Sequence, residues 1–179
     1  MANYVYIATS LDGYIATKDG GIEWLHTLPN PEQSDYGYAD FMEGIDALVM
    51  GRQTYEKVLS FDEWPYTKPV FVLSRTLKEV PAALEGKVEF VEGELRELVD
   101  GCRQRGYNHL YIDGGKVIQG FLEEDLIDEL IVTRVPILLG SGIPLFGELS
   151  RQMTWKHVNT TVYNDMLVKS HYTRHQRKA

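Results

Sequence analysis

The sequence predicts one α/β domain in three layers, with a mostly parallel mixed sheet covered by helices on both faces and an antiparallel hairpin at its C-terminal end. The chain has 179 residues, which is the usual size of one domain. Short apolar runs alternate with helix-like segments between residues 45 and 135, and this alternation is typical of parallel strands joined by helical crossovers. The last two strand-like runs follow each other directly, which predicts a hairpin.

Six of the expected strands are short runs rich in Val, Ile, Leu and Tyr. They cover residues 4–8, 47–50, 70–73, 88–91, 109–112 and 130–135. Helical spacing of apolar residues predicts helices over residues 35–42, 53–58, 94–104 and 116–123. The terminal hairpin is expected to pair residues 153–162 with residues 166–172 through a turn at residues 163–165.

Composition and charge exclude several classes of protein. With 18 basic and 26 acidic residues, the net charge of −8 disfavours nonspecific binding to nucleic acid or to an anionic membrane. The single cysteine, Cys102, cannot form an intramolecular disulfide, and no run approaches the length of a membrane span, so we expect a cytoplasmic protein. The five histidines are scattered, so no metal site is expected. The basic stretch over residues 169–178 is interpreted as a solvated strand end.

Glycine- or hydroxyl-containing segments follow three of the expected strands. They are Gly-Arg-Gln-Thr at residues 51–54, Ser-Arg-Thr at 74–76 and Asp-Gly-Gly-Lys at 113–116. Parallel strands bring their carboxyl ends to one edge of a sheet, where free backbone N–H groups and helix N-termini favour anions. Each segment alone is also compatible with an ordinary turn or helix start. Their coincidence predicts a site for a phosphate-bearing ligand at that edge.

Other nucleotide and hydrolase signatures are missing from the sequence. The glycines around residue 114 form neither the G-x-G-x-x-G fingerprint nor a P-loop. The Gly-Ser-Gly at residues 140–142 lacks the spacing of a hydrolase nucleophile elbow. A usual Rossmann site, a nucleotide triphosphatase and a serine hydrolase are therefore not supported.

Two aspartates are candidates for acid chemistry. Asp35 and Asp40 lie in the first expected helix, near the aromatic residues Trp24 and Tyr36 in sequence. Aromatic walls can raise the pKa of a carboxyl group, so that it holds a proton near neutral pH. The alternative is that both side chains face solvent or cap the helix.

Five segments together resemble one family. They are Ser-Leu-Asp-Gly-Tyr-Ile-Ala at residues 10–16, Met-Gly-Arg-Gln-Thr-Tyr-Glu at 50–56, Val-Leu-Ser-Arg-Thr at 72–76, Ile-Asp-Gly-Gly-Lys at 112–116 and Val-Pro-Ile-Leu-Leu-Gly-Ser-Gly-Ile-Pro-Leu-Phe at 135–146. In this order they resemble the dihydrofolate reductase-like superfamily, in the bacterial stand-alone branch related to the C-terminal reductase domain of the bifunctional riboflavin deaminase-reductase. The resemblance implies the corresponding fold, NADPH as cofactor, and hydride transfer from its nicotinamide.

The resemblance also implies roles for particular residues. Ala8 and Ile15 would contact the nicotinamide, and the loop over residues 11–24 would cover it. At the pyrophosphate, the resemblance implies Gly51, Arg52 and Thr54. The segment at the 2′-phosphate would be Leu73, Ser74 and Arg75. The diglycine turn that supports the pyrophosphate would comprise Gly114, Gly115, Lys116, Val117 and Ile118. In this fold the diglycine turn often contains a cis Gly-Gly peptide.

On the substrate side, the resemblance implies that Asp35 supplies a proton and that Thr133 is its hydrogen-bonded partner, with Asp40 as second choice. The expected function is an NADPH-dependent reductase that acts on a C=N or C=O group of a small heteroaromatic or ribityl-type substrate. Relatives of the riboflavin type are commonly dimers, so we expect a homodimer by resemblance.

Two alternatives stay open. One is a dihydrofolate reductase proper, which uses an arginine between the Gly-Arg turn and the next strand to hold the substrate's glutamate. Residues 53–69 contain no arginine and offer only Lys57 and Lys68, which lack the bidentate fork of arginine. The other alternative is a non-catalytic NADPH-binding module.

Overall fold

The computed structural model of the protein describes residues 1–175. Along the chain its elements are β1 (Ala2–Ser10), β2 (Tyr14–Ala16), η1 (Glu23–His26), α1 (Tyr38–Glu43), β3 (Ala47–Gly51), α2 (Arg52–Leu59), β4 (Val70–Leu73), η2 (Ala82–Leu84), β5 (Val88–Val91), α3 (Leu95–Gln104), β6 (His109–Asp113), α4 (Gly115–Glu123), β7 (Glu129–Val135), β8 (Ile143–Pro144), β9 (Trp155–Tyr163) and β10 (Leu167–Arg174). Here α denotes an α-helix, η a 3₁₀-helix and β a strand.

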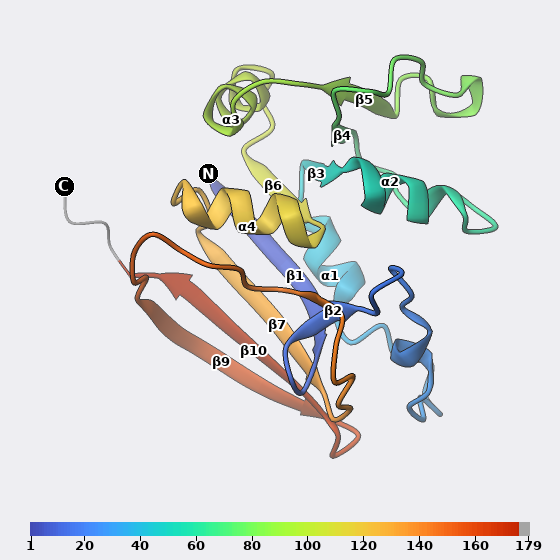
Figure 1. Cartoon of the computed structure of the whole chain (residues 1–179), viewed down its shortest axis with the longest axis vertical. Coiled ribbons are helices and arrows are strands. Elements are labelled where there is room, and N and C mark those ends of the chain that lie inside the picture. Colours follow the sequence, from blue (N-terminus) through green and yellow to red (C-terminus); the bar gives the residue numbers. More distant parts are fainter. Residues whose placement is uncertain (176–179) are drawn as a thin grey trace.

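Eight strands form one mixed sheet in the order β5-β4-β3-β6-β1-β7-β10-β9. Every pairing among the first six strands in this order is parallel. The pairings of β10 with β7 and with β9 are antiparallel. Figure 1 shows β9 and β10 extending the sheet beyond β7. The predicted α/β class, with a mostly parallel sheet and a C-terminal antiparallel hairpin, is confirmed.

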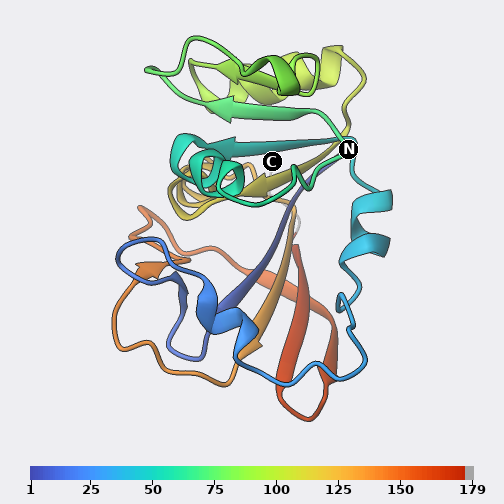
Figure 2. The ribbon, with the colours of Figure 1, turned by 90° about the vertical axis from the view of Figure 1, so that its right-hand side faces the viewer.

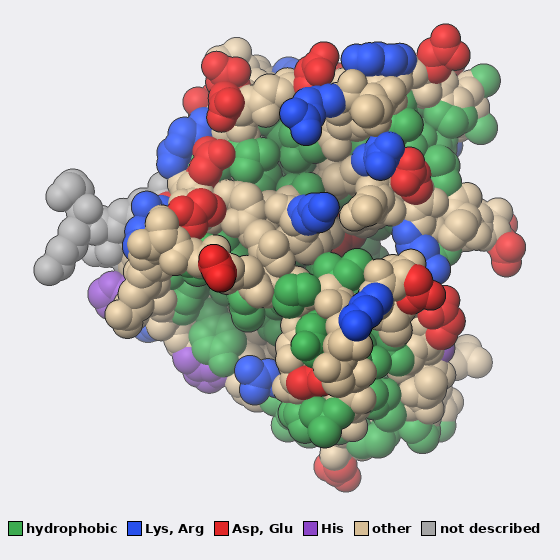
Figure 3. All heavy atoms as spheres, viewed as in Figure 1, with side chains coloured by type: hydrophobic (Ala, Val, Ile, Leu, Met, Phe, Trp, Pro, Cys, Tyr) green, Lys and Arg blue, Asp and Glu red, His purple; other side chains and the backbone are tan. Residues whose placement is uncertain are grey.

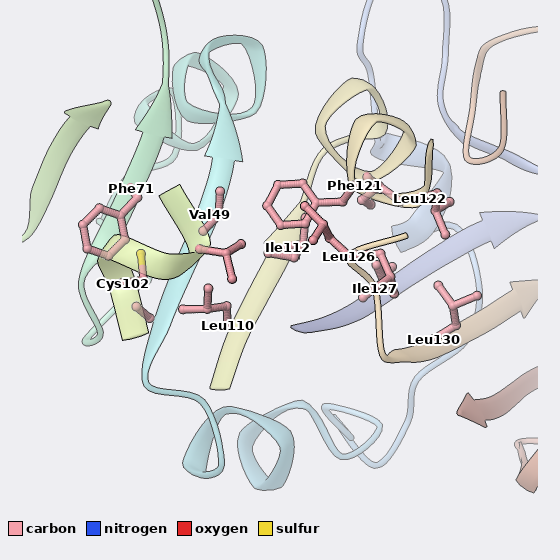
Figure 4. Close-up of a cluster of buried hydrophobic side chains, with 14 of the residues drawn as sticks. Val49, Phe71, Cys102, Leu110, Ile112, Phe121, Leu122, Leu126, Ile127 and Leu130 are labelled. Carbon is pink, nitrogen blue, oxygen red and sulfur yellow. The ribbon is translucent and has the colours of Figure 1, made fainter. Parts of the chain in front are cut away.

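Helices cover both faces of this sheet because successive residues of each central strand point to opposite faces. In β3, Val49 packs with residues of α3 and α4, whereas Leu48 packs with Tyr55 of α2 and Phe41 of α1. Figure 4 shows part of the first cluster, in which Phe121 and Leu122 of α4 lie close to the sheet residues. Figure 2 shows α1 on the side of the sheet opposite to α4.

Helix α1 is shorter than predicted. It begins at Tyr38 and not at Asp35, because Tyr36 and Gly37 have left-handed backbone conformations, with φ of 56° and 85°. A right-handed helix cannot include residues with positive φ. Asp35 is therefore placed in the turn before the helix.

A small second sheet pairs β2 with β8. The sequence analysis did not predict it, because strands of three and two residues leave no readable alternation of polar and apolar side chains. We call the segments over residues 11–16 and 137–145 together the β2–β8 ribbon, since backbone hydrogen bonds join them from Leu11 to Ile137 and from Leu145 to Gly13.

The terminal hairpin is confirmed, with its turn shifted by one residue. Asn164 and Asp165 have φ of 52° and 53°, and the N–H of Met166 donates to the carbonyl of Tyr163. This is a type I′ turn, in which Asn and Asp tolerate positive φ. The basic stretch begins within β10, whereas Arg177 and Lys178 lie outside the described residues. Among the helices of residues 1–175, none is long and apolar enough to cross a membrane.

Candidate active site

The three glycine- or hydroxyl-containing segments meet at one edge of the sheet. Gly51 of β3 is paired with Leu73 of β4, and Met50 is paired with Asp113 of β6. The chain therefore leaves the sheet at neighbouring points of β4, β3 and β6, and β1 is the next strand in the order. Figure 3 shows a hollow between the atoms over α2 and those over the segment that follows β2. The phosphate-binding residues implied by the sequence are thus brought to one place.

The diglycine turn between β6 and α4 is enclosed from two directions. Gly114 has φ of 90°, and a Cβ there would overlap the hydroxyl of Thr54. A Cβ on Gly115 would lie 3.1 Å from Cδ1 of Ile15 and 3.2 Å from Cγ2 of Ile143. Glycine is required because the backbone itself must approach α2 on one side and the β2–β8 ribbon on the other. The Gly114–Gly115 peptide is trans, so the expectation of a cis bond is wrong for this chain.

The cationic side of the edge is formed by residues after β3 and β4. Arg52 is exposed at the start of α2, and its Nη1 donates to the hydroxyl of Thr76 over 3.4 Å. The hydroxyl oxygen of Ser74 accepts the N–H groups of Thr76 and Leu77 at 3.2 and 3.0 Å. Arg75 is exposed beside them. Two guanidinium groups therefore stand next to a turn that Ser74 fixes.

The remaining residues that the resemblance implies for the cofactor differ in what they can contribute. Ala8 lies in β1 opposite Thr133 of β7, near the carboxyl ends of both strands. Lys116 is exposed in the first turn of α4. In contrast, Ile118 is fully buried, and Leu73 and Val117 pack against the core. These three positions can therefore offer mainly backbone atoms to a ligand.

The structure places Asp35 in a capping role. Its carboxylate accepts the N–H of Ala39 at 2.8 Å and that of Gly37 at 2.9 Å, and these two bonds lower the pKa of the Asp35 carboxyl. Within residues 1–175 the structure shows no hydrogen bond between Asp35 and Thr133, and Thr133 lies beside Ala8 and Lys169 in the sheet. Asp40 is exposed on α1.

The surroundings of Asp113, the last residue of β6, shift the pKa of its carboxyl in the opposite direction to that of Asp35. Burial raises the pKa of its carboxyl to about 6, although the N–H of Gly114 donates to it at 2.8 Å. The negative charge of Asp113 adds to the effect of burial in raising the pKa values of Tyr38, Tyr66 and Tyr111. A carboxyl with a pKa near 6 can both hold and release a proton at neutral pH.

Asp113 was not predicted as an acid from the sequence, although it directly precedes the glycine pair. A carboxylate at the carboxyl end of a central parallel strand was the available signal. Burial raises its pKa, and the three tyrosines whose pKa values its charge raises come from α1, from β6 and from the segment between α2 and β4.

One backbone carbonyl anchors the start of α1. The carbonyl oxygen of Tyr36 accepts hydrogen bonds from the hydroxyls of Tyr6 and Tyr163 at 3.0 and 3.1 Å and from Nζ of Lys169 at 2.6 Å. A Cβ on Gly37 would lie 2.9 Å from that Nζ. The donors come from β1 and from the terminal hairpin, so these elements fix where α1 presents Tyr38.

A cavity of about 160 Å³ lies elsewhere, at the edge where the strands begin. It is lined by Met1, Asn3, Arg96, Val99, Asp100, Arg103, Leu126 and Asp128. None of the predicted site residues belongs to it. Across the described residues 1–175, no group of three or more His, Cys, Asp or Glu side chains is arranged to hold a metal ion.

One family model matches most of the chain. The family model described as "RibD C-terminal domain" matches residues 4–169. These residues include all the candidate residues of this edge, from Ala8 to Thr133.

The chain is also similar to several solved structures. The "Putative riboflavin biosynthesis protein" of Shewanella sp. PV-4 has 54% identity and a TM-score of 0.95, with 98% of this chain and all of that chain covered. The chain is also similar to the diaminohydroxyphosphoribosylaminopyrimidine deaminase/5-amino-6-(5-phosphoribosylamino)uracil reductase of Thermotoga maritima, with 16% identity and a TM-score of 0.73. That similarity covers 97% of this chain and 56% of the Thermotoga maritima chain. A dihydrofolate reductase of Enterococcus faecalis has 19% identity and a TM-score of 0.69, with 98% and 97% of the two chains covered. The last two similarities concern the fold alone.

Proposed function

The chain belongs to the RibD C-terminal domain family, and on this basis we propose that it is an NADPH-dependent reductase that transfers hydride to a C=N or C=O group of a small heteroaromatic or ribityl-type substrate. The observation that supports this most is the convergence of Gly51, Ser74 and Gly114 at neighbouring points of one sheet edge. The reductase named in the Thermotoga maritima relative makes a phosphoribosylaminouracil-like compound the first substrate class to test.

The residues at this edge fit a phosphorylated dinucleotide. The glycines of the diglycine turn let its backbone approach α2 and the β2–β8 ribbon closely, and α2 and α4 both begin beside it. N–H groups at helix starts bind phosphate well. Arg75 and the hydroxyl of Ser74 would hold the 2′-phosphate, and Arg52 would face the pyrophosphate. When bound, NADPH supplies the hydride.

The chain itself supplies the proton. Hydride addition to the carbon of C=N or C=O leaves an electron pair on the nitrogen or oxygen, which must take up a proton. Asp113 is the group best suited to donate it, because its pKa of about 6 keeps a fraction of the carboxyl protonated at neutral pH. Asp35 with Thr133 remains the second candidate, although the bonds to Asp35 favour its ionised form.

Calorimetry with both coenzymes tests the cofactor assignment. We expect NADPH to bind the wild-type protein more tightly than NADH, and Arg75→Ala to weaken NADPH binding about tenfold with little effect on NADH. The reason is that a charge-assisted hydrogen bond to phosphate contributes ~1.5–3 kcal/mol. Lys78→Ala is the matched control, because Lys78 is an exposed cation nearby in sequence that pairs with Glu92. An unchanged NADPH preference in Arg75→Ala would contradict the assignment.

A spectrophotometric assay of NADPH oxidation tests the reaction. We expect turnover with the phosphoribosylaminouracil substrate and little with dihydrofolate, because Lys57, one of two lysines available for a glutamate tail, pairs with Glu23 at 3.6 Å. Robust dihydrofolate turnover would favour a dihydrofolate reductase proper. Tight NADPH binding without turnover of pterin, pyrimidine or quinone-like acceptors would favour a binding module.

A further inference from the structure

Asp12, in the turn after β1, bonds two segments that are far apart in the sequence. Its carboxylate accepts the hydroxyl of Ser10 at 2.6 Å, the N–H of Leu139 at 3.1 Å and the N–H of Gly140 at 2.7 Å. Ser10 is fully buried, and its oxygen also accepts the N–H of Tyr14 at 2.9 Å. One carboxylate therefore ties the end of β1 to a loop 127 residues further along the chain.

Asp12 supplies side-chain bonds to a ribbon that is otherwise joined by backbone bonds. The N–H of Leu11 donates to Ile137 over 2.8 Å, and the N–H of Leu145 donates to Gly13 over 3.0 Å. The pairing of β2 with β8 lies between these points, with Tyr14 opposite Pro144. The ribbon is thus short, and few bonds hold its two halves together.

The ribbon packs closely on the diglycine turn. Ile15 and Ile143, one from each half, lie near the position that a Cβ on Gly115 would take, at 3.1 and 3.2 Å. Within the ribbon, a Cβ on Gly142 would overlap the carbonyl of Ala16. Because the packing leaves so little space, a shift between the two halves must also shift the wall over Gly115.

The carboxylate form of Asp12 makes these bonds. The hydroxyl of Ser10, together with the N–H groups of Gly140 and Leu139, lowers the pKa of the Asp12 carboxyl. The group is therefore ionised at neutral pH, and bonds from N–H groups to a carboxylate are stronger than those between neutral partners.

We propose that Asp12 is a positioning residue that holds the β2–β8 ribbon against the diglycine turn and so slows release of the bound coenzyme. The identity of this ligand rests on the proposed function. Asp12 does not touch the reacting atoms in this proposal. It acts through Ile15 and Ile143, which form the wall over Gly115.

The test compares Asp12→Asn with Asp46→Asn. Asp46 is the matched control because its carboxylate also accepts two backbone N–H groups far along the chain, those of Asn108 and His109 at 2.7 and 2.8 Å, but it lies before β3, at the edge where the strands begin. An asparagine at position 12 turns an N–H₂ group toward backbone N–H donors and loses bonds to them. We expect Asp12→Asn to speed amide hydrogen exchange at Leu139 and Gly140 and to raise the NADPH dissociation rate about tenfold by stopped-flow fluorescence. Asp46→Asn should change neither.

Two further measurements separate positioning from general loss of structure. The ratio of NADPH to NADH affinity should stay unchanged in Asp12→Asn, because the 2′-phosphate residues are untouched. Asp12→Glu, which keeps a carboxylate, should recover part of the slow release. Faster exchange at Gly140 with an unchanged NADPH dissociation rate would overturn this inference alone, as would unchanged exchange. A wild-type protein that binds no NADPH would overturn the proposed function.

Discussion

Three aspartates of this chain show that surroundings decide what a carboxyl group can do. Hydrogen bonds from N–H or hydroxyl groups lower the pKa values of Asp12 and Asp35, whereas burial raises that of Asp113 to about 6. The first two are therefore structural anions at neutral pH. Of these three, Asp113 has the pKa that suits proton transfer near neutral pH.

Replacement of Asp113 and Asp35 by asparagine tests this distinction in turnover. General acid catalysis contributes typically ~10²–10⁴-fold, so we expect Asp113→Asn to lower kcat about 100-fold or more and Asp35→Asn to change it by only a few-fold. In the wild type, kcat should fall as the pH rises above 6, because the proton donor is then ionised. That decline should be missing in Asp113→Asn. Normal turnover by this variant would instead return the role to Asp35.

Asp113→Asn should also change the free energy of unfolding, in a direction that follows from the pKa of Asp113. The folded pKa of Asp113 exceeds its ordinary value of 3.8, so the ionised form is disfavoured in the folded state. The contribution of Asp113 to the free energy of unfolding is then greatest below pH 3.8 and declines as the pH rises to about 6. Relative to the wild type, Asp113→Asn should gain up to ~3 kcal/mol between pH 4 and pH 7. Urea unfolding of both proteins at the two pH values measures this difference, and a constant difference would contradict the raised pKa.

Among the elements, α1 shows how a local backbone conformation sets the position of a helix. Its start follows two residues with positive φ, and the carbonyl between them takes three hydrogen bonds from β1, β9 and β10. The left-handed region is costly for most residues, and such conformations persist where the surroundings impose them. The position of Tyr38, whose pKa the charge of Asp113 helps to raise, depends on this arrangement.

The two glycines that flank α1 give a matched pair of variants. Gly37→Ala should destabilise the protein by ~1–2 kcal/mol, because alanine disfavours a φ of 85° and its Cβ would crowd Nζ of Lys169. Gly44→Ala should be within ~0.5 kcal/mol of the wild type, because Gly44 has a φ of −81° and a Cβ there meets nothing closer than 3.6 Å. Urea unfolding measures both, and equal effects would refute the role of the left-handed turn.

For the whole molecule, β9 forms one edge of the sheet, and within residues 1–175 it pairs with β10 alone. Val158 and Val162 on this strand are 48% and 56% exposed. A long edge strand with apolar side chains invites pairing with another chain. These features favour the homodimer expected by resemblance.

Light scattering tests the homodimer. We expect a mass twice the 20.5 kDa of one chain, and Val162→Lys should shift the protein toward the monomer by placing a charge at the edge. Lys156→Ala, also on β9, is a control that removes a charge. A wild-type monomer at all concentrations would refute the expectation.

The elements that were predicted correctly are those with local signals. The apolar runs of β3, β4 and β6 stand out because central parallel strands are buried on both faces. The β2–β8 ribbon was missed because its strands are very short and their partners lie far apart in the chain. The start of α1 was misplaced because positive φ at Tyr36 leaves no clear mark in the sequence.

Gly51, Ser74 and Gly114 can be assigned to one edge from the amino-acid pattern alone, because each follows a strand of the same parallel sheet and such strands end on the same side. Which aspartate keeps a proton, and which one joins the ribbon, depends on contacts that form only in the folded chain. Asp113 is buried only once the chain has folded, and the bonds of Asp12 require a loop that arrives from beyond β7. A pKa depends on everything that surrounds a group in space, and chain order alone does not contain that information.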